Sequence, residues 1–169
     1  MRTKPKNKPG TALVVCTGNI CRSPVGEVLL RHALAAQPEP LRSLKVASAG
    51  VAAMPSWPAS EHSETVSRQA GLSLEGHRSR QLTQALVDDA LAIYCMTEAH
   101  RLMILAGFER TDGKVFLWRE FMPPEKTGDI ADPYGGDLAE YERCRDEIME
   151  ALPSLTRHLR GLLQKQAPR

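Results

Sequence analysis

The chain has 169 residues, 42% of them hydrophobic and 25% charged, a composition typical of a water-soluble protein with one hydrophobic core. Its formal net charge of +2 is too small to indicate a nucleic acid or an acidic membrane surface as a partner. No apolar run approaches the roughly 20 residues that span a bilayer, and no apolar signal-peptide core follows the basic N-terminus. We therefore expect a cytoplasmic protein whose four cysteines are mostly reduced.

Short strand-like runs alternate with longer helical stretches along the chain. Four strands are expected, over residues 11–15, 44–48, 91–95 and 114–117. Helices are expected over residues 24–36, 60–70, 83–89, 98–106 and 138–163. Pro153 should kink the last helix or divide it in two. The alternation predicts a parallel sheet with helices on both faces and an active site at the carboxyl ends of the strands.

Further features of the chain follow from composition and spacing. Residues 1–10 predict a disordered basic tail, because they have almost no apolar content and carry Arg2, Lys4, Lys6 and Lys8. Residues 11–163 then form a single domain, and residues 164–169 a C-terminal tail. Residues 121–136, rich in Pro and Gly, predict a long functional loop. The apolar face of the first helix is expected to carry Val25, Val28, Leu29, His32, Ala33 and Ala36.

The segment CTGNICRS, residues 16–23, links the first expected strand to the first helix. Such a loop can turn its backbone N–H groups inward beside the positive end of the helix dipole, and so bind an oxyanion. Gly18 allows close approach of the backbone, Asn19 tolerates a left-handed conformation, and Arg22 offers bidentate donors to phosphate. The same positive field favours the thiolate of Cys16, to which Ser23 can donate. The loop therefore predicts both an anion site and an activated nucleophile.

Other interpretations of this loop fit less well. A nucleotide-binding loop would end in Lys-Ser or Lys-Thr, which this segment lacks. A metal site on Cys16 and Cys21 has no second Cys/His pair at suitable spacing, and Arg22 would face the cation. A thioredoxin-like site needs two intervening residues between its cysteines. Two buried cysteines in an ordinary turn would leave the Gly, Asn, Arg and Ser residues unexplained.

The run VVCTGNICRSP, residues 14–24, resembles the signature of the low-molecular-weight protein tyrosine phosphatases. The likeness covers roughly residues 11–160 and continues, in the order of the family, through residues 48–50, 76–81, 94–96 and 132–134. It implies a flavodoxin-like three-layer α/β sandwich with a four-stranded parallel sheet. It also implies a single phosphatase domain over residues 11–163 that acts on a phosphorylated protein. We expect a monomer that requires no metal or organic cofactor.

The resemblance assigns the catalytic roles. Cys16 would form a phosphocysteine, Arg22 would bind the phosphate, and Asp132 would protonate the leaving group and then activate water. The Asp-Pro-Tyr-Gly-Gly segment supports the last role, because a turn-rich loop can hold a carboxylate over a cleft. The phosphate-binding residues would be Thr17, Gly18, Asn19, Ile20, Cys21 and Arg22.

Further roles follow from the same resemblance. The residues expected to brace the phosphate loop by hydrogen bonds are Asn19, Ser23, Ser48 and His77. The substrate pocket would be walled by Ile20, Tyr134 and Trp57, although Trp57 between prolines equally suits surface packing. Cys21 would form a reversible disulfide with Cys16 or be a buried structural thiol. Cys95 and Cys144 are expected in the core.

The substrate is the point on which the sequence leaves alternatives. Thr97-Glu98-Ala99-His100 and the Asp-Pro-Tyr-Gly-Gly run are more similar to the bacterial branch that includes protein arginine phosphatases. That branch carries a threonine where this chain has Ile20, and an apolar side chain favours an aromatic ring over a guanidinium. We therefore expect phosphotyrosine, with phosphoarginine as the alternative. An arsenate reductase would need a close pair of further cysteines, and a silent phosphate-binding module would not need Asp132.

Overall fold

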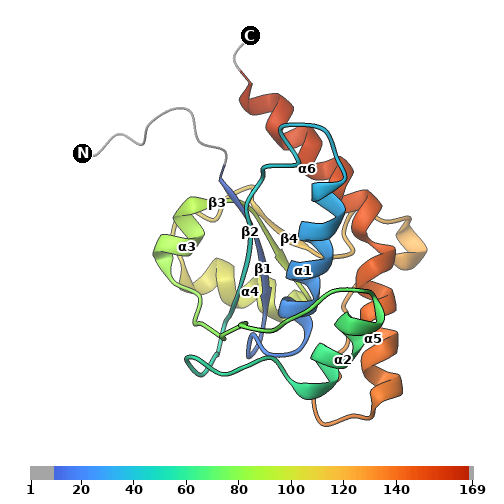
Figure 1. The fold of residues 1–169 in the computed structure, drawn as a ribbon. Helices are drawn as coiled ribbons and strands as arrows, with labels where there is room; N and C mark the ends of the chain where they lie inside the picture. The colour runs from blue at the N-terminus through green and yellow to red at the C-terminus, as the bar shows by residue number, and fades with distance from the viewer. Residues whose placement is uncertain (1–9, 168–169) are drawn as a thin grey trace.

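The computed structural model describes residues 10–167, so the expected basic tail lies outside the described residues except for Gly10. Its centre is a four-stranded, all-parallel sheet in the order β2-β1-β3-β4. The strands are β1 (Thr11–Cys16), β2 (Val46–Gly50), β3 (Ala90–Cys95) and β4 (Val115–Leu117). Figure 1 shows the sheet in the middle of the molecule between two layers of helices. The expected flavodoxin-like three-layer sandwich is therefore confirmed.

The helices divide between the two faces of the sheet (Figure 1). The larger group packs on one face and consists of α1 (Arg22–Ala35), α2 (Glu61–Gln69), α5 (Leu138–Glu150) and α6 (Leu152–Gln166). The other face carries α3 (Gln84–Asp89) and α4 (Glu98–Gly107). A short 3-10 turn, η1 (Pro124–Lys126), interrupts the long loop between β4 and α5. Within residues 10–167, no helix is both long and apolar enough to cross a lipid bilayer.

Alternate residues of β1 supply two separate cores. Ala12, Val14 and Cys16 belong to the core beneath α1, whereas Leu13 and Val15 belong to the core beneath α3 and α4. A strand that is buried on both faces has a continuous run of apolar residues, which is why β1 could be predicted clearly from the sequence. The same alternation puts Cys16 at the carboxyl end of β1, on the side where α1 begins.

The elements differ from expectation in three places. β2 covers Val46–Gly50 rather than 44–48, because Leu44 is buried from the preceding turn instead of from the strand. In α1, Leu30 and Leu34 are buried while His32 is exposed, since α1 packs against α5 and α6 as well as the sheet. Ala36, expected on the apolar face, is exposed just after the helix ends. The helix α6 continues to Gln166, so residues 164–166 extend it rather than form a tail.

Polar side chains cap the N-termini of several helices. Thr83 caps α3 by accepting from the N–H of Leu86, and Thr97 caps α4 by accepting from the N–H of His100 at 3.2 Å. Each cap satisfies a backbone donor that has no partner within its helix. Pro153 stands in the first turn of α6, where it needs no N–H partner, and it separates α6 from α5 as expected. The cap on α4 also places His100 in the first turn after β3.

Candidate active site

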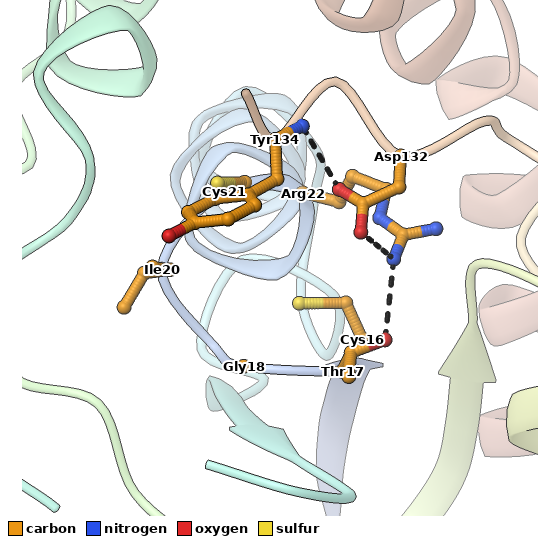
Figure 2. A pocket seen from close by; sticks show the side chains of 8 residues that line it. All are labelled: Cys16, Thr17, Gly18, Ile20, Cys21, Arg22, Asp132 and Tyr134. Atoms are coloured by element: carbon orange, nitrogen blue, oxygen red, sulfur yellow. Dashed lines mark hydrogen bonds and ion pairs between the residues drawn. The ribbon is translucent and has the colours of Figure 1, made fainter. Parts of the chain in front are cut away.

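A pocket of about 190 Å³ lies at the carboxyl end of β1, where the sequence predicted the site. Figure 2 shows that its walls come from the loop after β1 and from the loop before α5. The lining residues are Cys16, Thr17, Gly18, Ile20, Cys21, Arg22, Asp132 and Tyr134. The fold therefore brings Asp132 and Tyr134 over the Cys16 loop from a distant part of the sequence.

Asn19 holds the loop in its curved form from inside. It has a left-handed backbone with φ of 57°, and its side chain is fully buried. Its Nδ2 donates to Ser23 Oγ at 2.8 Å and to Ser48 Oγ at 2.9 Å. Its Oδ1 accepts from the backbone N–H of Arg80 at 3.0 Å. One amide thus ties the loop to α1, to β2 and to the segment around residue 80.

The remaining bracing contacts reach the loop from outside. His77 Nε2 lies 2.8 Å from the carbonyl oxygen of Asn19. Ser48 donates to the carboxylate of Glu27, and Arg80 Nε donates to the carbonyl of Ser48 at 2.9 Å. Sequence reasoning named His77 and Ser48 but missed Glu27 and Arg80. Both were detectable only as charged residues close to named motifs, since nothing local indicates that they meet.

Glycine is required at position 50, where β2 passes closest to the loop. A Cβ at Gly50 would lie 2.4 Å from the carbonyl oxygen of Thr17 and 3.0 Å from the backbone nitrogen of Asn19. Atoms that close overlap, so a side chain there would push the loop away from β2. The expected Ser-Ala-Gly segment therefore shapes the loop by backbone packing as well as by the Ser48 hydrogen bond.

Cys16 is 2% exposed, and its Sγ lies 3.0 Å from Ser23 Oγ. The helix α1 begins at Arg22, and no side chain caps its N-terminus. Its first backbone N–H groups and the positive end of its dipole therefore adjoin the pocket. This environment favours an anion in the pocket, next to the sulfur of Cys16.

Arg22 is 3% exposed and is held on two sides. Its Nη1 donates to the carbonyl of Ile130 at 3.0 Å, and its Nη2 lies 3.4 Å both from Thr17 Oγ1 and from an Asp132 oxygen (Figure 2). Its Nε is buried and has no hydrogen-bond partner among the described residues. An unpartnered buried donor is costly, and an oxyanion in the pocket would satisfy it.

The Asp132 carboxylate stands at the mouth of the pocket, with its side chain 50% exposed. One of its oxygens accepts from the backbone N–H of Tyr134 at 3.1 Å, which fixes its orientation. Tyr134 is 69% exposed and lines the same mouth. Trp57 does not line the pocket. Its backbone pairs with Ser79, and its half-exposed indole lies on the surface. Of the two placements expected for Trp57, pocket wall or surface packing, the structure shows surface packing.

A family model described as low molecular weight phosphotyrosine protein phosphatase matches residues 11–166. The chain belongs to this family. Members of the low-molecular-weight phosphatases are hydrolases that act on phosphoric monoesters, so the chain is a phosphatase. The resemblance seen in the sequence is confirmed over nearly the whole domain.

Named relatives fall into two substrate groups. A protein-arginine-phosphatase of Geobacillus stearothermophilus is 36% identical over 151 residues, covering 89% of this chain and 97% of the relative. The low molecular weight protein-tyrosine-phosphatase Etp of Escherichia coli is 38% identical over 127 residues, covering 75% and 79%. The family likeness alone therefore leaves both phosphorylated residues open as substrates.

Solved structures show the same division. The YwlE arginine phosphatase from G. stearothermophilus superposes with a TM-score of 0.81 at 34% identity, covering 95% of this chain and 99% of that one. The tyrosine phosphatase Wzb from E. coli, in complex with sulphate, gives a TM-score of 0.79 at 32% identity, covering 90% and 99%. Because both groups share the fold equally well, the fold does not select the substrate.

The other three thiols of this phosphatase are buried and, like Cys16, form no disulfide. Cys21 donates to Ser60 Oγ at 3.4 Å and lies 3.3 Å from the Tyr141 hydroxyl, and burial raises the pKa of its thiol. Burial also raises the pKa of Cys95 and of Cys144 to about 12 each. Cys95 and Cys144 belong to different cores on opposite faces of the sheet, so they do not form the close pair of an arsenate reductase.

His100 lies beside the site, although sequence reasoning named it only within a run similar to the arginine phosphatase branch and gave it no role. It is 4% exposed, and its Nε2 lies 2.8 Å from Thr17 Oγ1. Burial, helped by the positive charge of Arg22, lowers the pKa of His100 to about 4, so the ring is neutral at pH 7. Its position could have been inferred from the sequence, because it lies in the first turn of the helix that follows β3, at the sheet edge that carries the pocket.

Proposed function

We propose that this phosphatase hydrolyses phosphotyrosine in proteins through a phosphocysteine on Cys16. The observation that carries the proposal is the Arg22 guanidinium, which is buried beside Cys16 and beneath Asp132 with its Nε unpartnered among the described residues. That arrangement supplies a nucleophile, an anion-binding cation and a proton donor around one small pocket. A silent phosphate-binding module would make no use of the carboxylate.

The first step transfers the phosphoryl group to sulfur. The Cys16 thiolate attacks phosphorus while the bond from phosphorus to the tyrosine oxygen breaks. Asp132, in its protonated form, delivers its proton to that oxygen as it leaves. The loop N–H groups and Arg22 neutralise the charge on the three remaining phosphoryl oxygens, and Ser23 donates to the sulfur when it later departs.

The second step releases phosphate. Asp132, now ionised, takes a proton from a water molecule, whose oxygen attacks phosphorus as the sulfur–phosphorus bond breaks. Cys16 returns as a thiolate, and Asp132 is again protonated for the next turnover. Half-exposure of Asp132 suits both roles, because the carboxylate must meet the leaving oxygen and then the water.

Ile20 and Tyr134 support phosphotyrosine as the substrate. Both line the pocket, and an aromatic ring can pack against them without losing hydrogen bonds. A phosphorylated guanidinium in the same place would lose hydration, and Ile20 offers it no acceptor. Phosphoarginine remains the second candidate because a named protein-arginine-phosphatase matches 89% of the chain.

An assay on matched peptides tests the choice of substrate. One peptide sequence is prepared with phosphotyrosine and with phosphoarginine, and each form is given to wild type, Ile20→Thr and Cys16→Ser. We expect wild type to prefer phosphotyrosine and Ile20→Thr to shift the kcat/KM ratio toward phosphoarginine by about tenfold, since threonine adds a polar partner. Cys16→Ser measures the uncatalysed background. A wild type that already prefers phosphoarginine would make that residue the substrate.

A further inference from the structure

His100 and Thr17 form a polar contact beside the pocket that the proposed mechanism leaves unused. His100 Nε2 lies 2.8 Å from Thr17 Oγ1, and Arg22 Nη2 lies 3.4 Å from the same oxygen. Thr17 comes from the loop after β1, whereas His100 comes from the first turn of α4. Thr17 also lines the pocket itself, as Figure 2 shows, so its hydroxyl can reach a bound group.

The surroundings of His100 favour one protonation form of its ring. Its Nδ1 is buried and has no hydrogen-bond partner among the described residues. A buried N–H without an acceptor costs more than a buried lone pair, so the neutral ring carries its proton on Nε2. The charges that act on the ring are Arg22, Asp132 and Asp129, and burial outweighs them in keeping the ring neutral. In this form Nε2 donates to Thr17 Oγ1.

Thr17 then accepts two hydrogen bonds. A hydroxyl oxygen has two lone pairs and one hydrogen. One lone pair accepts from His100 and the other from Arg22, so the hydrogen takes the direction that is left. Because Thr17 lines the pocket, that hydrogen is available to an oxygen of whatever anion fills it.

We propose that Thr17 Oγ donates a hydrogen bond to the bound phosphoryl group and that His100 is the positioning residue that orients it. The contact from His100 also holds Thr17 against Arg22, and so helps to fix the guanidinium beside the anion. This inference rests on the proposed function, since it concerns the same phosphate site. It adds a side-chain donor to the backbone donors of the loop.

Binding of inorganic phosphate tests the proposal without requiring turnover. Its dissociation constant is measured by calorimetry on the full chain for wild type, Thr17→Val, His100→Ala and the double variant. Thr17→Val preserves shape but removes the hydroxyl. We expect each single variant to weaken phosphate binding by about tenfold, and His100→Ala to add less than about twofold in the Thr17→Val background.

Three controls separate positioning from folding. His32→Ala removes an exposed histidine from α1 and should leave phosphate binding unchanged. Thr17→Ser keeps a hydroxyl and should bind nearly as well as wild type. His100→Gln restores an amide donor near the position of Nε2 and should recover most of the loss caused by His100→Ala, while thermal unfolding of each variant reports its stability.

The outcomes distinguish this inference from the proposed function. If His100→Ala weakens binding as much without the Thr17 hydroxyl as with it, His100 does not act through Thr17 and the inference is overturned. It is also overturned if folded Thr17→Val binds phosphate as tightly as wild type. Either result leaves the phosphatase mechanism intact, whereas a folded wild type that binds no phosphate would overturn both.

Discussion

Replacing Cys16 by serine is expected to lower kcat on a phosphotyrosine peptide by about 10⁴-fold or more. A serine hydroxyl is not ionised at neutral pH and lacks a neighbouring base, because the contact of Cys16 Sγ is with Ser23 Oγ. The loss is measured by steady-state release of phosphate. Phosphate binding should largely survive, since the bracing contacts run through Asn19 rather than through the sulfur.

Cys95→Ser is the matched control for this loss. Cys95 is buried in β3, belongs to the core on the α3 and α4 side, and donates to the carbonyl of Phe116 at 3.2 Å, a bond that serine can keep. It should retain activity close to that of wild type. Substantial turnover by Cys16→Ser, above the rate with no enzyme, would show that another group attacks phosphorus.

Replacing Asp132 by asparagine is expected to lower kcat/KM on phosphotyrosine by about 10²- to 10³-fold, because proton delivery to the leaving oxygen belongs to the first step. The amide cannot deliver a proton, although it can still accept from the N–H of Tyr134. The loss should be much smaller on p-nitrophenyl phosphate, whose leaving oxygen is weakly basic and needs little protonation. The measurement is kcat/KM for the two substrates side by side, since hydrolysis of the phosphocysteine, which also uses Asp132, is common to both and would affect kcat equally.

Asp137→Asn provides the control for this substitution. Asp137 follows the same turn, caps α5 by accepting from the N–H of Glu140, and does not line the pocket. Asparagine caps a helix about as well as aspartate, so the variant should fold and turn over normally. An equal loss in kcat/KM on both substrates for Asp132→Asn would argue against proton donation to the leaving group.

The chemistry around Cys16 was predictable because it is local. Strand, loop and helix follow one another in sequence, and Gly18, Asn19 and Arg22 stand at spacings that a phosphate loop requires. The left-handed backbone of Asn19, with φ of 57°, follows from the residue type and its place in that loop. Asp132 came instead from the resemblance, since an aspartate before proline is by itself an ordinary turn former.

Contacts between distant segments were not predictable. The buried side of α1 carries Leu30 and Leu34 because α5 and α6, far along the chain, pack on it, and spacing within α1 does not contain that information. The contact between His100 and Thr17 likewise depends on how far α4 lies from the loop after β1. Trp57 lies outside the pocket because its backbone pairs with Ser79, a partner that nothing in its own neighbourhood indicates.

In the proposed mechanism the phosphoryl group passes through Cys16. The most direct measurement quenches wild type during turnover of a phosphotyrosine peptide and maps the attached phosphate by mass spectrometry. We expect phosphate on the peptide that contains Cys16, absent from Cys16→Ser and lost on incubation as water completes the reaction. Phosphate attached to a different residue, or full turnover with no phosphoenzyme at any quench time, would contradict it.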